Sequence, residues 1–368
     1  MKNDKTYKPD WTPKNAGKEF AVNVVKGVEQ NSLPKLNNNG IKSQTPSVDE
    51  LVSGVLDDNR NLLARSITLI ESNSEFHHQK ASQILNKLLP HSSKSIRIGI
   101  SGVPGAGKST LIEALGLYLI GEGHKVAVLT VDPSSSVSKG SILGDKTRME
   151  KLSRENNCFI RPSPSGGNLG GVTRKTRETI TVCEAAGFDV ILIETVGVGQ
   201  SEITVRSMVD FFLLVMIAGA GDELQGIKKG IIEISDALVF NKADGSNKQK
   251  ANIAKVEFAN AVHYLQPYAK DWQVRVLTAS ALTGEGIDKI WEMISEFIKL
   301  SKINNSFMEE RKKQSLQWMY SLIEESLKNS FFNNPDIKKD LKEIEKQIIS
   351  EKILPTVAAD ILLKKFNN

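Results

Sequence analysis

Apolar and polar positions alternate in blocks between about residues 93 and 300, and the blocks change periodicity along this part of the chain. Short, almost wholly apolar runs such as 126–131 and 211–217 are typical of strands buried on both faces of a parallel sheet. Segments with helical periodicity separate most of these runs, which predicts an α/β domain with a mostly parallel sheet flanked by helices. Ligands of such folds bind at the carboxyl ends of the strands. We expect strands at 96–100, 126–131, 189–193, 211–217, 237–240 and 274–278.

The chain before this domain has two parts that differ in composition and periodicity. Residues 1–45 are polar and rich in lysine and asparagine, which predicts a flexible N-terminal extension. The pattern then becomes apolar and periodic, and Ser47 and Glu50 have the spacing of a capping box at a helix start. One helical run follows, and a second helix is expected over 76–89. Residues 46–92 therefore form a predicted N-terminal helical arm.

Three amphipathic segments, at 309–326, 337–349 and 356–366, follow the domain and predict helices. A packed helical appendix and an arm for dimerisation or partner docking both agree with this pattern. Exposed apolar stripes need a partner. A C-terminal helical dimerisation arm is therefore our prediction for residues 301–368.

Composition narrows the class of protein. The 368 residues are 40% hydrophobic and 25% charged, typical of a globular protein, and the net charge of +5 gives no argument for nucleic acid. Cys158 and Cys183 are far apart in the sequence and match no metal-site spacing, which suits a reducing cytosol. The histidines have no metal-ligand spacing either, so a metal-delivery role lacks its usual residues. The longest apolar run, 211–220, is half a membrane span, and the N-terminus lacks a signal region. We expect a cytoplasmic protein that does not bind membranes.

A glycine-rich stretch lies between the first predicted strand and a helical pattern. In this context G-x-x-x-x-G-K-[ST] indicates a phosphate-binding loop. The glycines allow a tight turn whose backbone N–H groups, with the helix N-terminus, hold the phosphates of a nucleotide. Lys108 is expected to reach the β- and γ-phosphates, and the Ser109 hydroxyl to bind Mg²⁺. The predicted contacts are Gly102, Val103, Pro104, Gly105, Ala106, Gly107, Lys108, Ser109 and Thr110.

The sequence Asn-Lys-Ala-Asp follows the strand expected at 237–240. Its Asp carboxylate can accept hydrogen bonds from guanine N1–H and the 2-amino group, whereas adenine would leave the desolvated charge unpaired. The stretch after residue 278 resembles the short loop whose backbone N–H contacts guanine O6. Behind a phosphate loop, these features predict GTP as the nucleotide. The predicted base contacts are Asn241, Lys242, Asp244, Ser280, Ala281 and Leu282.

Glu194 follows the third predicted strand, opposite the phosphate loop. A carboxylate there is expected to bind Mg²⁺ directly or through water. Gly197 would let a backbone N–H approach the γ-phosphate, which makes the segment a candidate switch. Asp132 and Asp145 follow the second predicted strand and could complete the Mg²⁺ and water network, although a lone Asp after a strand is more often a helix N-cap.

Residues 219–230 form a third glycine-rich, charged loop beside the predicted site. Lys228 or Lys229 could turn toward the phosphates and stabilise charge in the transition state. Solvated lysines are the alternative, and composition alone favours that alternative.

Four basic residues lie around the sequence Ser-Pro-Ser-Gly-Gly at 163–167. A site for phosphate or an acidic partner is one interpretation, and a solvated face is the default. No aromatic residues alternate with them, which argues against RNA. The four residues are Arg161, Arg174, Lys175 and Arg177.

Together these motifs resemble the MeaB-like, methylmalonyl-CoA mutase-associated GTPases, which are also labelled ArgK or LAO/AO transport ATPases. The resemblance extends from about residue 46 to at least residue 300. The segments that carry it are 102–110, 131–135, 141–149, 194–202, 219–230 and 241–244.

The resemblance implies a homodimeric G-protein chaperone of an adenosylcobalamin-dependent acyl-CoA mutase, with methylmalonyl-CoA mutase as the first candidate partner. Such a chaperone gates cofactor loading and protects the mutase while it hydrolyses GTP to GDP and phosphate. The resemblance also implies catalytic roles for Lys108, Asp132, Glu194 and Lys228. Lys228 would act in a third switch when the mutase docks. It assigns Ser109, Asp132, Asp145 and Glu194 to the Mg²⁺ and water network.

Two other functions remain as alternatives. A kinase tied to basic amino-acid transport would transfer the γ-phosphate to an acceptor other than water. A metal-insertion GTPase would need a Cys/His cluster, which the sequence lacks.

Overall fold

The computed structural model describes residues 46–131, 149–162, 169–195, 201–219, 229–264 and 267–367. The predicted N-terminal extension, 1–45, lies outside these ranges. Among the described helices, none combines the length and the apolarity that crossing a bilayer requires.

A seven-stranded sheet forms the centre of the described chain, with strand order β3-β2-β4-β1-β5-β6-β7 and every neighbouring pair parallel. This confirms the predicted α/β class, and all six expected strands are present. Among the described strands, the one that the sequence pattern missed is the short edge strand β3, in which buried and half-buried residues alternate. The strands are β1 (Ile96–Gly102), β2 (Val126–Val131), β3 (Cys158–Arg161), β4 (Val190–Thr195), β5 (Phe211–Ile217), β6 (Ala237–Asn241) and β7 (Arg275–Thr278).

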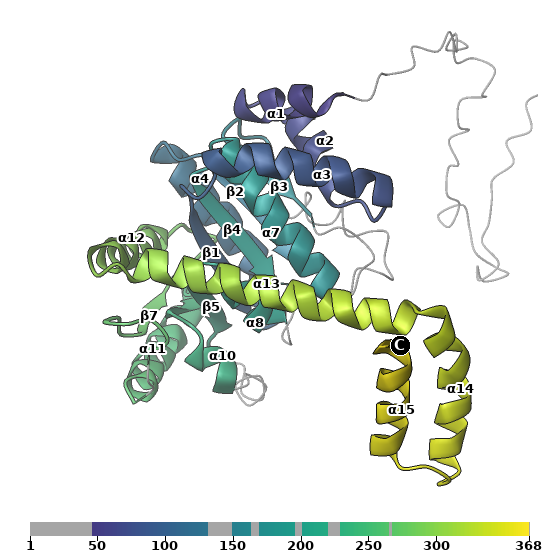
Figure 1. Ribbon diagram of the computed structural model, residues 1–368. Helices are drawn as coiled ribbons and strands as arrows, with labels where there is room; N and C mark the ends of the chain where they lie inside the picture. Colours follow the sequence, from purple (N-terminus) through teal and green to yellow (C-terminus); the bar gives the residue numbers. More distant parts are fainter. Residues whose placement is uncertain are drawn as a thin grey trace, which may run out of the picture. The chain divides into compact units, whose positions relative to one another are not determined.

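Helices cover both faces of the sheet, and each face has its own apolar core (Figure 1). On one face lie α4 (Lys108–Gly121) and α12 (Ile287–Ile303), with the short α6 (Glu150–Ser153). On the other face lie α7 (Leu169–Ala185), α8 (Ser201–Arg206), α10 (Lys229–Glu233) and α11 (Lys248–Val262). Burial on both sides explains why the central strands read as continuous apolar runs.

The N-terminal arm packs against α7 and consists of α1 (Val48–Leu56), α2 (Arg60–Ile70) and α3 (Glu75–Leu88). The predicted capping box is present: Glu50 N donates to Ser47 Oγ (3.2 Å) and Ser47 N donates to Glu50 Oε2 (2.7 Å). The prediction of one helical run before α3 is wrong. Asp58 has a φ of +59° and the Asn59 side chain caps α2, so the run is divided into two helices.

The C-terminal region consists of α13 (Ser306–Asn333), α14 (Pro335–Ile349) and α15 (Pro355–Asn367). All three predicted helices are present, and the first extends beyond its predicted bounds at both ends. The helices α14 and α15 pack on each other around a small core of Ile337, Ile344, Ala358 and Leu362.

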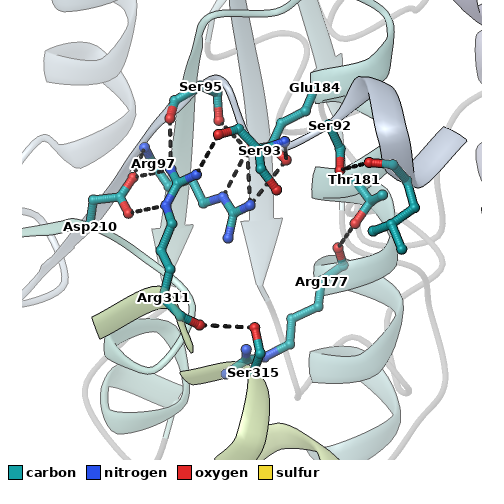
Figure 2. Close-up of polar contacts among 11 residues, drawn as sticks. Ser92, Ser93, Ser95, Arg97, Arg177, Thr181, Glu184, Asp210, Arg311 and Ser315 are labelled. Atoms are coloured by element: carbon teal, nitrogen blue, oxygen red, sulfur yellow. Dashed lines mark hydrogen bonds and ion pairs between the residues drawn. The ribbon is translucent and has the colours of Figure 1, made fainter. Parts of the chain in front are cut away.

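A buried polar network fixes the first turns of α13 to the amino-terminal end of the sheet, as Figure 2 shows. Arg311 Nε and Nη2 donate to the two carboxylate oxygens of Asp210, each over 2.7 Å. Its other hydrogen bonds reach the backbone carbonyls of Ser93 (2.9 Å) and Ser95 (2.7 Å), directly before β1. Asp210 Oδ2 also accepts from the backbone N–H of Arg97 in β1 (2.8 Å). The network therefore joins α13 to the strand that carries the phosphate loop at its other end.

Candidate nucleotide-binding site

The predicted phosphate loop connects β1 to α4 at the carboxyl edge of the sheet, and two of its glycines are required by close contacts. A Cβ on Gly102, whose φ is +153°, would lie 2.1 Å from the carbonyl oxygen of Val215 in β5. Gly107 has a φ of +80°, and a Cβ there would lie 2.8 Å from Asn241 Nδ2. The glycines therefore let the loop lie directly against the neighbouring strands.

Lys108 is the first residue of α4, and its ammonium group lies against the loop itself. Nζ donates to the carbonyl oxygens of Gly102 (2.7 Å) and Val103 (3.2 Å). Burial lowers the pKa of Lys108, and the nearby carboxylates of Glu194 and Glu202 oppose this shift. The lysine is thus a buried cation held at the place where nucleotide phosphates bind in a loop of this type.

Ser109 and Glu194, which the sequence predicts as Mg²⁺ ligands, lie together. Ser109 Oγ donates to Glu194 Oε1 over 2.9 Å, and the Glu194 side chain is 5% exposed at the end of β4. A hydroxyl and a carboxylate oxygen on adjacent elements suit a hard cation such as Mg²⁺. The other predicted members of this region, Asp132, Asp145 and Gly197, lie outside the described residues, and so does Lys228.

The predicted base-reading residues form one bonded unit after β6 and β7. Asn241 Nδ2 donates to the carbonyl oxygens of Ala106 (2.9 Å) and Gly107 (3.3 Å), and its Oδ1 accepts from Ala281 N (3.2 Å). Ser280 Oγ donates to Asp244 Oδ2, which orients the carboxylate. Asn241 thus ties the phosphate loop to the two loops predicted to contact guanine.

The remaining predicted contacts lie at the edges of this unit. Lys242 has a left-handed backbone with a φ of +58°, and Leu282 is largely exposed. A cavity of about 280 Å³ lies beside the loop after β7, and Thr110, Ala281 and Leu282 are among the residues that line it. Thr110, Ala281 and Leu282 therefore border a space between the first turns of α4 and the loop after β7.

Sequence reasoning missed the placement of Glu202. This residue of α8 is fully buried, and its carboxylate is close enough to raise the pKa of Lys108. Its only signal was its place at the end of the 194–202 segment, because nothing in the pattern shows that α8 packs on β1 and β4.

The four basic residues, predicted as a site for phosphate or an acidic partner or as a solvated face, are all half-buried, and binding of phosphate or an acidic partner stays a prediction. Each of them contacts a polar side chain in α7 or in the segments that follow α2 and α8. The contacts are Arg161–Glu71, Arg174–Glu178 (3.0 Å), Lys175–Asn73 (2.7 Å) and Arg177–Ser207 (2.8 Å).

A parallel sheet with this phosphate loop, the Ser109–Glu194 contact and an Asn-Lys-x-Asp loop at the same edge define a P-loop GTPase. The family model described as methylmalonyl Co-A mutase-associated GTPase MeaB matches residues 63–336. The chain therefore belongs to the MeaB family of GTPases, and it is a GTP hydrolase.

Individual relatives agree with this assignment. GTPase ArgK of Escherichia coli is 48% identical over 280 residues, which are 76% of this chain and 85% of the relative. The mouse methylmalonic aciduria type A homolog, a mitochondrial protein, is 43% identical over 331 residues, covering 87% and 80% of the two chains. A crystal structure of a LAO/AO transport system kinase superposes with a TM-score of 0.72 and 37% identity, over 87% of this chain and 98% of that one.

Proposed function

We propose that the protein is a G-protein chaperone of an adenosylcobalamin-dependent acyl-CoA mutase, with methylmalonyl-CoA mutase as the first candidate. It would gate cofactor loading and protect the mutase, with GTP hydrolysis as the timer. The observation that carries the proposal is the family match over residues 63–336, which includes every segment predicted to contact the nucleotide. A cytoplasmic location is part of the proposal, because the two cysteines of the protein are free and buried, which suits a reducing compartment.

In this proposal the phosphate loop holds the triphosphate, and Lys108 stabilises the charge that develops as water attacks the γ-phosphate in line. Ser109 and Glu194, with Asp132 and Asp145, would hold Mg²⁺, which neutralises phosphate charge when bound. Gly197 would approach the γ-phosphate as part of a switch. Among the residues that the structure describes, no group of three or more His, Cys, Asp and Glu side chains could hold a metal ion, so nothing there supports metal insertion.

Asp244 is proposed to select guanine by accepting hydrogen bonds from its N1–H and 2-amino groups. The hydrogen bond from Ser280 holds the Asp244 carboxylate in one orientation. Each hydrogen bond to a charged group contributes about 1.5–3 kcal/mol. Asp244→Ala should therefore lower the preference for GTP over ATP at least about a hundredfold. Competitive binding of both nucleotides measures this preference, and Asp288→Ala, on the exposed surface of α12, is the control. An unchanged preference in Asp244→Ala would remove Asp244 from the base site.

The mutase partnership is tested by adding purified methylmalonyl-CoA mutase to the full chain and measuring GTP turnover. We expect turnover to rise, and Lys228→Ala to remove most of the rise while Lys289→Ala, on the exposed face of α12, leaves it intact. A verified complex with an unchanged rate would count against the third-switch role. The absence of any complex with this mutase or with related acyl-CoA mutases would refute the chaperone function.

A homodimer is the proposed assembly, formed through α13. An apolar stripe with coiled-coil spacing runs along the exposed side of this helix. The stripe consists of Leu316, Met319, Tyr320, Ile323 and Leu327, all between 43% and 60% exposed. A second copy of the same helix would cover the stripe by a two-fold arrangement.

A further inference from the structure

Arg206, the last residue of α8, is a buried guanidinium whose hydrogen bonding is incomplete. Its Nη2 lies 3.3 Å from Asp236 Oδ1, whereas no described residue accepts a hydrogen bond from Nε or Nη1. The guanidinium lies over the Tyr268 ring instead, with 4.0 Å between its carbon and the ring centroid. A buried cation held by one carboxylate and one ring resists displacement, because leaving either partner is costly.

Tyr268 joins Arg206 to the C-terminal helix α13. Its hydroxyl donates to Glu310 Oε1 over 3.1 Å. One turn further along α13, Gln314 Nε2 donates to the carbonyl oxygen of Val209 (2.9 Å), which lies just after α8. Arg311, whose network Figure 2 shows, lies between Glu310 and Gln314 in the sequence of α13. The first turns of α13 therefore hold the end of α8 through both its side chain and the chain that follows it.

The middle of α13 lies against α7 (Figure 1). The Arg177 guanidinium lies 5.3 Å from the centroid of a Trp318 ring and also donates to the carbonyl oxygen of Ser207 (2.6 Å). Near the start of α7, a Cβ on Gly170 would lie 3.0 Å from Glu325 Oε1. The helix α13 thus contacts α7 at two positions along its length, and it also contacts the end of α8.

The two contacted helices follow β3 and β4 along the chain, and the carboxyl ends of these parallel strands lie at the nucleotide edge of the sheet. We propose that α13 is the output element of the GTPase, and that exchange of GTP for GDP is transmitted to it through the Arg206–Tyr268–Glu310 contact. GTP and GDP then give α13 different affinities for a partner. By thermodynamic linkage, binding of that partner alters the preference for GTP over GDP by the same factor by which the affinities differ. This coupling requires the GTPase activity alone and does not depend on which partner the protein serves.

Hydrogen–deuterium exchange of the full chain tests the coupling, in the GDP complex and in the complex with Mg²⁺ and a non-hydrolysable GTP analogue. Exchange of amides in the first half of α13 should differ between the complexes by at least about fivefold, the lower end of typical coupling between sites. Tyr268→Phe keeps the ring beneath Arg206 and removes the hydroxyl that reaches Glu310. In this variant the difference should fall below about twofold.

Tyr264→Phe is the matched control, because Tyr264 is 87% exposed and lies just beyond α11. It should keep the wild-type difference. Equal exchange in both wild-type complexes, with binding of both nucleotides verified by fluorescence, would overturn the coupling and leave the GTPase assignment intact. Equal loss of protection in both complexes of Tyr268→Phe, with the difference preserved, would make the contact merely structural and would overturn the coupling as well.

Discussion

At the scale of single residues, Gly102 shows how tightly the phosphate loop lies on the sheet. Because a Cβ there would meet the Val215 carbonyl at 2.1 Å, Gly102→Ala must displace backbone. We expect a loss of at least about 2 kcal/mol in the free energy of unfolding, together with weaker GDP binding. Gly121→Ala, near the end of α4, meets nothing within 4 Å and should gain up to about 1 kcal/mol from helix propensity. Urea denaturation and GDP titration measure both effects, and equal stability of the two variants would contradict this account.

Asp236 is the residue whose ionisation should be visible in the pH dependence of stability. Burial raises the pKa of Asp236 from 3.8 to about 6, against the opposing effect of Arg206. The folded chain therefore holds this proton more tightly than the unfolded chain, so the contribution of Asp236 to stability is full below about pH 4 and is lost as the pH rises to about 6.

Asp236→Asn cannot ionise and removes this contribution. The free energy of unfolding of the wild type, relative to the variant, should fall between about pH 4 and pH 6 and stay constant above that range. Urea denaturation of both proteins across these pH values measures the difference. A difference that does not change with pH would show that Asp236 keeps its ordinary pKa.

The sequence motifs predict that the site residues lie at the carboxyl ends of the strands, and the described ones do. Ser109 and Glu194 were predicted together and lie 2.9 Å apart, because parallel strands bring their carboxyl ends to one edge. Glu202 and Arg177 were not understood from the sequence. Their burial depends on how α8, α7 and α13 pack on one another, and no local pattern encodes that packing.

At the scale of elements, the position of α13 depends on Arg311. Arg311→Ala leaves Asp210, whose side chain is 3% exposed, as a buried carboxylate without its guanidinium. Removing one partner of a buried pair costs about 3–5 kcal/mol, so we expect a loss of that size in the free energy of unfolding. Lys313→Ala, which removes a 60% exposed side chain two residues away, should change it by less than about 0.5 kcal/mol. Thermal and urea denaturation compare the two, and similar losses would argue against the anchor.

The elements that the sequence pattern missed share a physical cause. Strand β3 has only four residues at the sheet edge, too few for its alternation to stand out. The apolar periodicity continues across the break between α1 and α2. The break itself consists of Asp58, whose backbone is left-handed, and Asn59, which caps α2. Periodicity detects buried faces reliably, but it does not detect a short turn that preserves the face.

At the scale of the whole molecule, the exposed stripe on α13 predicts a dimer that one charge should disrupt. Ile323→Glu places a carboxylate in the middle of the stripe and should weaken dimerisation at least about thirtyfold, the equivalent of a 2 kcal/mol hot spot. Ser321→Glu introduces the same group on another side of the helix and should leave the dimer intact. Sedimentation velocity over a concentration series measures both. A wild-type protein that stays monomeric at every concentration would refute this assembly.

Asn241 has a consequence for how the molecule holds its nucleotide. One amide group contacts the phosphate loop through its nitrogen and the loop after β7 through its oxygen, so the two halves of the site share a single rigid support. At the predicted site, GTP would bind as a chelating ligand: once one half of the nucleotide is bound, the other half binds without a further loss of translational freedom. Guanosine alone or pyrophosphate alone should consequently bind far more weakly than an equal division of the affinity of GTP would suggest.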